Sequence, residues 1–314
     1  MSQSFFHLVV TERKMAASNS TVKLINDKVI FVQVLVILFL CINLLLIMTF
    51  FTKEFFYSTM RYILFAVTLM SDSLLLVMSD LLLILNYFHF TIQMWLCIII
   101  FMVSSLYTFV TPLTLTAMTL ERYVAICLPL RHGELCSTRN TLHCILIIHS
   151  FSSVPCIVLL SIFFASVTHG SYTQGRVCSV EIFIFHMWQR HLRSAINQFY
   201  FLIMCITIVL SYVKIMRVAK AASGEDKKSS WKGLRTVGLH AFQLLLCLIQ
   251  MWCPIIESAV LQINVMLFFI VRYFNYITFT LAPRCLSPLI YGLRDEMFFH
   301  SLKKLAVCGL YRKQ

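Results

Sequence analysis

The sequence predicts an all-helical membrane protein built from seven transmembrane spans. Of its 314 residues, 60% are hydrophobic and only 12% are charged. A soluble domain needs a more polar surface than this composition supplies, so lipid must cover most of the outside. The apolar runs are long and unbroken, which favours helices over the alternating strands of a membrane barrel.

Seven runs in the sequence are long enough to span a bilayer, which takes roughly 20 apolar residues. They lie at 29–51, 62–87, 93–123, 143–167, 195–220, 234–256 and 265–291. An odd number of spans places the two termini on opposite faces of the membrane. No cleavable signal peptide is visible, so we expect the first span to act as an anchor.

The basic residues predict the orientation. The connections 52–61, 122–142, 214–236 and 292–314 carry 17 lysines and arginines, and the opposite set carries 7. Basic loops stay in the cytoplasm, so residues 1–28 should be extracellular, 29–291 the membrane domain and 292–314 a cytoplasmic tail. Four basic residues before the first span oppose this locally, but the whole-chain bias outweighs them. Asn19-Ser20-Thr21, a glycosylation sequon, agrees with an external N-terminus.

The net charge of +13 lies mostly on these cytoplasmic connections. We therefore interpret it as a topology signal and an attraction to the anionic lipid bilayer, and not as a nucleic-acid site.

Most of the 12 cysteines fall within spans or on the reducing side of the membrane. Only Cys97, at the outer end of the third span, and Cys178, in the long external loop, lie in oxidising space. They are the natural disulfide pair, and two unpaired thiols are the alternative.

Charged residues within spans need an explanation because each costs at least ~2.5–3.5 kcal/mol near the bilayer centre. Asp72, Asp80, Arg272 and Arg284 are such residues, and Glu257 marks the outer end of the sixth span. One interpretation is that they pair as structural contacts between helices, and the other is a ligand or switch network inside the bundle. A transporter or channel is a further hypothesis that such buried charges support.

Glu121-Arg122-Tyr123 ends the third span at its cytoplasmic boundary. A long basic side chain there can extend to water. An arginine preceded by an acid can also be held in a local ion pair and released when a partner helix moves. The spacing alone leaves both interpretations open.

With these residues the chain resembles the rhodopsin-like G protein-coupled receptors. Asn43 in the first span, Asp72 in the second and the sequence Pro288-Leu289-Ile290-Tyr291 closing the seventh match that family. Cys97 lies 25 residues before Arg122, as the family's loop disulfide requires.

Within this family the chain resembles the odorant receptors. The string "RYVAICLPLRH" is highly specific for them, and "SPLIYGLRDEMF", Ser211-Tyr212 and His240 support it. Glu121 and Ser287 stand where odorant receptors usually have Asp and Asn, which indicates a divergent branch of the fish type. A receptor for another small ligand or a peptide is the nearer alternative.

The resemblance implies that agonist binding shifts a population toward an arrangement in which the sixth helix swings outward. Pro254 would supply the kink. Arg122, released from Glu121, would contact a heterotrimeric G protein of the olfactory stimulatory type, with Tyr212 and Tyr291 as its partners. Trp252 is expected at the switch position of the sixth span, and counting from His240 gives Leu248 instead.

The resemblance also implies a ligand site for a small organic odorant between the third, fifth, sixth and seventh spans. Ser104 stands where amine receptors carry an acid, and Leu281 where opsins carry the retinal lysine, which disfavours both ligands. The projected lining is mainly apolar with scattered hydroxyl and amide groups. It comprises Ser104, Ser105, Thr108, Asn197, Tyr200, Trp252, Ile256, Ala259 and Ile277.

A sharper hypothesis concerns Asp72, whose counterpart in many relatives binds sodium beside small polar groups. Thr111 matches one of these groups, but Arg284 occupies another. We predict that Arg284 pairs with Asp72 in place of sodium, and the alternative is that it points toward Asp80 or a water-filled gap.

After Tyr291, residues 294–307 place apolar side chains on one helical face, which predicts a short amphipathic eighth helix on the inner leaflet. Cys308 follows and is a candidate for palmitoylation. We find no catalytic motif, metal-ligand cluster or cofactor-binding pattern, so we expect no enzyme and no cofactor.

Overall fold

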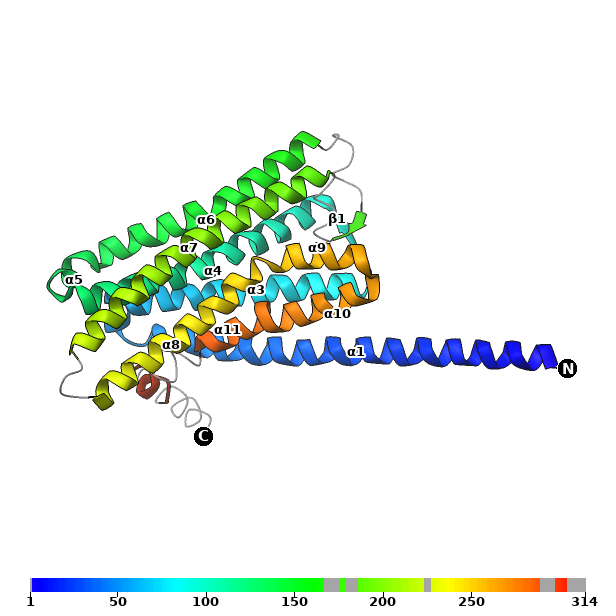
Figure 1. Ribbon diagram of the computed structural model, residues 1–314, viewed down its shortest axis with the longest axis horizontal. Coiled ribbons are helices and arrows are strands. Elements are labelled where there is room, and N and C mark those ends of the chain that lie inside the picture. The colour runs from blue at the N-terminus through cyan, green and yellow to red at the C-terminus, as the bar shows by residue number, and fades with distance from the viewer. Residues whose placement is uncertain (1, 167–174, 179–185, 223–226, 289–296, 304–314) are drawn as a thin grey trace.

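The computed structural model describes residues 2–166, 175–178, 186–222, 227–288 and 297–303. Figure 1 shows a bundle of long helices with short strands at one end. In the described residues, 6 helices are long and apolar enough to cross a membrane, and a bent helix pair raises the number to 7. The predicted seven-helix membrane fold is therefore confirmed.

The first half of the bundle is organised around the third span. Helix α1 (Ser2–Phe50) contacts α3 (Met60–Tyr87), which follows the short α2 (Glu54–Ser58). Helix α4 (Met94–Cys127) lies at the centre because it contacts α3, α6, α7 and α8. Helix α1 begins at Ser2, so the segment before the predicted first span is helical as well, and Figure 1 shows it extending beyond the bundle.

The next helices are α5 (Pro129–Leu135), α6 (Thr138–Ser166) and α7 (Met187–Ala222). Pro129 stands in the first turn of α5, where its missing N–H costs no hydrogen bond. Helix α6 packs on α4, and α7 packs on both α4 and α6.

The sixth span is broken into α8 (Lys227–Gln250) and α9 (Cys253–Ile263), which meet at 45°. Pro254 explains the break, because it has no N–H to donate to the Gln250 carbonyl one turn earlier. The Ile255 N–H bonds to the Trp252 carbonyl at 3.0 Å, which tightens the chain at the start of α9.

The seventh span changes its helical winding along its length. Helix α10 (Val265–Asn275) is followed by the π-helical segment η3 (Tyr276–Leu281) and by α11 (Ala282–Ser287). Asn264 caps α10 by accepting a hydrogen bond from the Met266 N–H at 2.8 Å. Wider π-helical turns change the face on which each following side chain lies.

Strand β1 (Thr91–Gln93) pairs antiparallel with β2 (Gly175–Val177), with Thr91 opposite Val177. The predicted disulfide is present, with the Cα atoms of Cys97 and Cys178 5.5 Å apart. It ties the segment after α6 to the start of α4. We call this end of the bundle the disulfide end, and the opposite end, where α4 finishes, the Glu121 end.

The side chains divide into a core and a lipid-facing surface. The main core cluster joins α3, α4, α7 and α8, and a smaller one joins α1 to η3 through Val32, Val36, Leu76 and Leu281. Large apolar residues such as Ile147 and Val209 are exposed. Such an exposed surface is expected where hydrocarbon replaces water.

Residues 297–303 are helical and lie beside the Glu121 end, within the segment where the eighth helix was predicted. Phe298 is buried against Phe56 and Phe65, with ring centroids 5.2 Å and 5.6 Å away. The contact fastens this segment to α2 and α3. Cys308 and Tyr291 lie outside the described residues.

Candidate functional site

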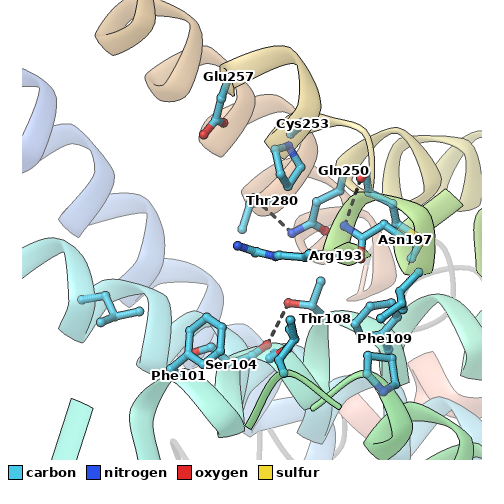
Figure 2. A pocket seen from close by; sticks show the side chains of 17 residues that line it. Phe101, Ser104, Thr108, Phe109, Arg193, Asn197, Gln250, Cys253, Glu257 and Thr280 are labelled. Atoms are coloured by element: carbon cyan, nitrogen blue, oxygen red, sulfur yellow. Dashed lines mark hydrogen bonds between the residues drawn. The ribbon is translucent and has the colours of Figure 1, made fainter. Parts of the chain in front are cut away.

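A cavity of about 230 Å³ lies between α4, α7, the bent sixth span and η3 (Figure 2). Its α4 residues, from Phe101 to Phe109, belong to the half of that helix nearer the disulfide end. Most of its lining is apolar, which suits a small organic ligand. It comprises Leu82, Phe101, Ser104, Ser105, Thr108, Phe109, Pro155, Leu159, Arg193, Ile196, Asn197, Gln250, Met251, Cys253, Pro254, Glu257 and Thr280.

Helix α4 presents a row of hydroxyls to this cavity. Ser104 donates to the Ile100 carbonyl at 2.8 Å, and Thr108 donates to the Ser104 carbonyl at 2.8 Å. Since each hydroxyl proton is used within the helix, the oxygen lone pairs remain as acceptors. This side of the cavity therefore offers acceptors to a ligand N–H or O–H.

Asn197 connects α7 to the break in the sixth span. The Ile255 N–H bonds to Trp252 and not to the Met251 carbonyl, which therefore lacks its usual helical donor. The Asn197 Nδ2 donates to that carbonyl at 3.3 Å (Figure 2). A lining residue thus stabilises the bent conformation.

Two oppositely charged side chains line the same cavity. Arg193 comes from α7 and Glu257 from α9. The Asn275 Nδ2 donates to the Glu257 Oε1 at 3.1 Å, which holds that carboxylate against α10. Figure 2 shows the Arg193 side chain extending into the middle of the cavity.

The structure brings together four of the nine predicted ligand residues, namely Ser104, Ser105, Thr108 and Asn197. The other five do not line the described cavity. Tyr200 is buried and donates to the Phe151 carbonyl at 2.7 Å. Trp252 is 40% exposed and packs edge-on against Phe201.

Of the remaining three predicted residues, Ile256 and Ala259 are exposed, and Ile277 packs against the smaller core cluster. Leu248, the alternative for the switch position, is buried in the main core. The two candidates therefore lie in different surroundings, with Leu248 inside the bundle and Trp252 near its surface.

Sequence reasoning missed Arg193, Gln250, Glu257 and Thr280 as lining residues. The signal for Arg193 was its position four residues before Asn197, because residues four apart share a helical face. Arg193 was instead assigned to the preceding loop.

Next to the cavity, in the bundle interior, Asp72 and Arg284 form an ion pair. Their exposed fractions are 0% and 1%, and the Arg284 Nε lies 3.9 Å from the Asp72 Oδ1. Thr111 donates to Asp72 Oδ1 at 3.0 Å and Ser287 donates to Oδ2 at 2.9 Å. A buried charge pair needs such additional hydrogen bonds to offset its desolvation.

Arg284 also reaches the cavity lining. Its Nη2 donates to the Gln250 Oε1 at 3.4 Å, and its Nη1 donates to the Thr280 carbonyl. Gln250 in turn donates to the Thr280 hydroxyl at 3.2 Å, as the dashed line in Figure 2 marks. A continuous set of polar contacts therefore runs from the cavity to Asp72.

Beyond Asp72 the contacts continue toward the Glu121 end. Gln243 donates to the Ser287 hydroxyl at 2.6 Å and to the Pro283 carbonyl at 3.3 Å. Asn43, on α1, is fully buried, and its amide finds no hydrogen-bond partner among the described residues. Pro288 is the last described residue of the seventh span and is buried.

At the Glu121 end, the buried Glu121 carboxylate meets α5. The His132 Nε2 lies 3.3 Å from the Glu121 Oε1. Burial, and after it the Glu121 and Cys144 charges, raise the pKa of the Cys136 thiol in the α5–α6 connection. The segment after α4 therefore contacts Glu121, the acidic residue of Glu121-Arg122-Tyr123.

The neighbours of Glu121 contact α7. The Lys214 ammonium lies 5.6 Å from the centre of the Tyr123 ring, a cation–π geometry. The Tyr212 hydroxyl is within electrostatic reach of Arg122. The structure therefore brings the end of α4 beside α7 at Tyr212 and Lys214.

The described residues contain no group of three or more His, Cys, Asp or Glu side chains that could hold a metal ion. The polar side chains that line the cavity can bind a ligand through hydrogen bonds and ionic contacts.

The bundle, its bent sixth span and its interior site define a class of membrane receptor. Residues 15–291 match the family described as 7 transmembrane receptor (rhodopsin family), and the chain belongs to that family. The family consists of receptors that couple to G proteins, and it is not a class of enzymes.

Two zebrafish (Danio rerio) proteins are similar to the chain. Odorant receptor 131-2 is 43% identical over 289 residues, which cover 92% of this chain and 89% of the relative. Galanin receptor 2a is 26% identical over 212 residues, which cover 62% of this chain and 54% of the relative. The predicted resemblance to the odorant receptors is thereby confirmed.

Proposed function

We propose that this protein is an odorant receptor that binds a small organic molecule in the cavity and activates a heterotrimeric G protein. One observation carries the proposal: Gln250 and Thr280 line the cavity and also accept hydrogen bonds from the buried Arg284. The similarity to odorant receptor 131-2 over 92% of the chain supports the class of ligand.

Ligand contact is assigned to the four predicted residues on the cavity wall. Ser104, Ser105 and Thr108 supply hydroxyls from α4, and Asn197 supplies an amide from α7. A ligand that takes the Asn197 N–H would compete with the Met251 carbonyl for it. Ligand binding would therefore act directly on the break of the sixth span.

Activation follows from a shift between two arrangements of the bundle. The break between Gln250 and Cys253 lets α8 pivot against α9. A ligand that reorients Gln250 would weaken its bond to Arg284, and through Arg284 alter the surroundings of Asp72. Because coupling free energies are reciprocal, a G protein that favours the new arrangement would tighten ligand binding.

The Glu121 end is the proposed site of G protein coupling. Glu121 and its partner His132 would hold the resting arrangement. Arg122 would contact the G protein when α8 moves, with Tyr212 as its partner from α7. Tyr123, Pro288 and Tyr291 are assigned to the same switch, and Tyr291 lies outside the described residues.

We further propose that the protein resides in the plasma membrane with an extracellular N-terminus, and that its G protein is of the olfactory stimulatory type. The 17 basic residues of the connections near the Glu121 end support this orientation. A disulfide at the opposite end also supports it, since disulfides form in oxidising space.

In this orientation residues 1–28 are external, 29–291 form the membrane domain and 292–314 are cytoplasmic. Asn19 would carry a glycan and Cys308 a palmitoyl group. Both modifications are proposed from the sequence.

The test is a panel of small organic compounds applied to cells that express the receptor with an olfactory stimulatory G protein. Nucleotide exchange on the G protein and cyclic AMP are read out together with ion flux. We expect ligand-stimulated exchange that Arg122→Ala abolishes. Ligand-dependent ion flux without nucleotide exchange would support a channel or transporter and contradict the proposal.

A further inference from the structure

We propose that the ligand of the cavity is a small zwitterion, a molecule with one carboxylate and one ammonium group, of which the α-amino acids are the simplest class. The proposal rests on the proposed receptor function and specifies its ligand. The observation behind it is that Arg193 and Glu257, which carry opposite charges, line one cavity of about 230 Å³.

Arg193 is suited to bind the carboxylate. It lies five residues into the fifth span, which starts at Trp188, and so roughly 7 Å along the helix from its end. Figure 2 shows its guanidinium between the α4 wall and Thr280 of η3. A guanidinium has five N–H donors in a planar fork that matches a carboxylate. Arg193 can therefore bind a ligand carboxylate in addition to its other partners.

Glu257 is suited to bind the ammonium. Its Oε1 already accepts from the Asn275 amide at 3.1 Å, which fixes the carboxylate at the cavity wall. An ionised carboxylate has about four lone-pair sites, so this bond leaves acceptor capacity for a ligand cation. Figure 2 shows Glu257 on α9, apart from the Ser104 side of the cavity.

The hydroxyls of α4 add acceptors to the same cavity. Ser104 and Thr108 each donate their proton to a carbonyl of their own helix at 2.8 Å. Their oxygens therefore remain available as acceptors for a polar hydrogen of the ligand. Arg193 and Asn197, in contrast, bring N–H donors to the carboxylate.

Charge complementarity favours a zwitterion over the simpler ligand classes. An anion without an ammonium would face the like charge of Glu257, and a cation without a carboxylate would face that of Arg193. Inside a helix bundle such like-charge contacts are poorly screened. A neutral ligand would form an ionic contact with neither side chain. A zwitterion brings a group of opposite charge to each of them.

Size and wall chemistry restrict the ligand further. A cavity of about 230 Å³ holds a molecule of roughly eight non-hydrogen atoms, by comparison with about 30 Å³ for a water. Phe101, Leu159 and Ile196 give it an apolar wall. An amino acid with an apolar side chain of moderate size, such as leucine, fits these limits.

The test compares matched compounds on the full-length receptor in cells, with nucleotide exchange on the G protein as the readout. Each set contains an apolar amino acid, its deaminated acid, its decarboxylated amine and a neutral amide. For leucine these are 4-methylpentanoate, 3-methylbutylamine and 4-methylpentanamide. Sets built on alanine, valine, methionine and phenylalanine cover other side-chain sizes.

We expect an amino acid to be the most potent compound, by about tenfold or more over its singly charged analogues, since each lost charge removes a charge-assisted contact. Arg193→Gln should bring the amino acid and its amine to similar potency, because the carboxylate no longer matters. Glu257→Gln should bring the amino acid and its deaminated acid to similar potency, because the ammonium no longer has an ionic partner. Each potency ratio compares two compounds on the same variant, so it does not depend on how much of that variant the cells express.

Arg190→Gln and Glu54→Gln are the matched controls, because neither residue lines the cavity. Both should keep the potency ratios of the unmodified receptor. Neutral or singly charged compounds that outrank the amino acids, or ratios that Arg193→Gln and Glu257→Gln leave unchanged, would overturn the zwitterion while the receptor function stands. If no compound of any charge class stimulates exchange, the proposed function itself fails.

Discussion

The Gln250 Oε1 accepts a hydrogen bond from the Arg284 Nη2 at 3.4 Å, which joins a cavity residue to the buried ion pair with Asp72. Gln250 is also the last residue of α8 before the break in the sixth span. One side chain therefore touches the ligand cavity, the pivot and the charged centre of the bundle. The first prediction concerns this side chain.

Replacing Gln250 by leucine should weaken the coupling between ligand and G protein while the fold persists. We expect agonist potency in nucleotide exchange to fall by about 5–150-fold, the usual range of allosteric coupling. Gln33→Leu is the matched control, because Gln33 bonds Asp80 and does not line the cavity. Equal losses in both variants would argue against a specific role for Gln250.

Replacing Arg284 by methionine should strongly destabilise the receptor, because it leaves the Asp72 carboxylate buried without its ion partner. Breaking a buried pair in this way costs about 3–5 kcal/mol. Thermal unfolding in detergent measures the effect. The double variant Asp72→Asn with Arg284→Met should recover most of the loss, since it removes both charges.

The ion pair of Arg284 and Asp72 also leads to a prediction of how sodium affects the unfolding temperature of the receptor. If Arg284 takes the place of a cation beside Asp72, the unmodified receptor should unfold at the same temperature in sodium and choline chloride. Arg284→Met should become more stable in sodium. A steep sodium dependence of the unmodified receptor that Arg284→Met does not change would contradict the ion pair as a sodium substitute.

Replacing His132 by alanine should raise the basal rate of nucleotide exchange, because Glu121 loses its partner on α5. His132 is partly exposed, so the contact is modest and we expect an increase of roughly twofold to fivefold. The exposed His143 on α6 provides the control variant, His143→Ala. Unchanged basal exchange in His132→Ala would show that the contact does not hold the resting state.

Replacing Cys97 or Cys178 by serine should reduce the amount of folded receptor at the cell surface. The bond closes a loop across 81 positions, and loss of a native disulfide costs about 2–5 kcal/mol. Cys41→Ser is the control, since Cys41 is a free, exposed cysteine. Surface labelling and thiol counting under non-reducing conditions measure both effects.

The family resemblance indicated part of the cavity lining, and α4 is regular where it lines the cavity. Ser104, Ser105 and Thr108 share one face at spacings of three and four residues, and that face meets the cavity. Composition and run length likewise predicted the seven spans, since the bilayer fixes both. The spans depend on local pattern alone, whereas the α4 residues of the cavity were carried over from the resemblance.

Several other predicted lining residues lie on irregular backbone, and the spacing of residues in the sequence does not encode such irregularities. Ile256 and Ala259 follow the 45° break, which turns their faces away from the direction that a straight helix would give. Ile277 lies in the π-helical η3, whose wider turns bring Thr280 to the cavity instead. Arg193 was missed because the start of α7 was placed too late in the sequence.

We infer that ligand in the cavity and G protein at the Glu121 end are coupled through Gln250 and Arg284. The most direct measurement is the dissociation constant of an agonist with and without nucleotide-free G protein, in the unmodified receptor and in Gln250→Leu. We expect at least about fivefold tighter binding with G protein in the unmodified receptor and little difference in the variant. An undiminished difference in Gln250→Leu would contradict coupling through this side chain.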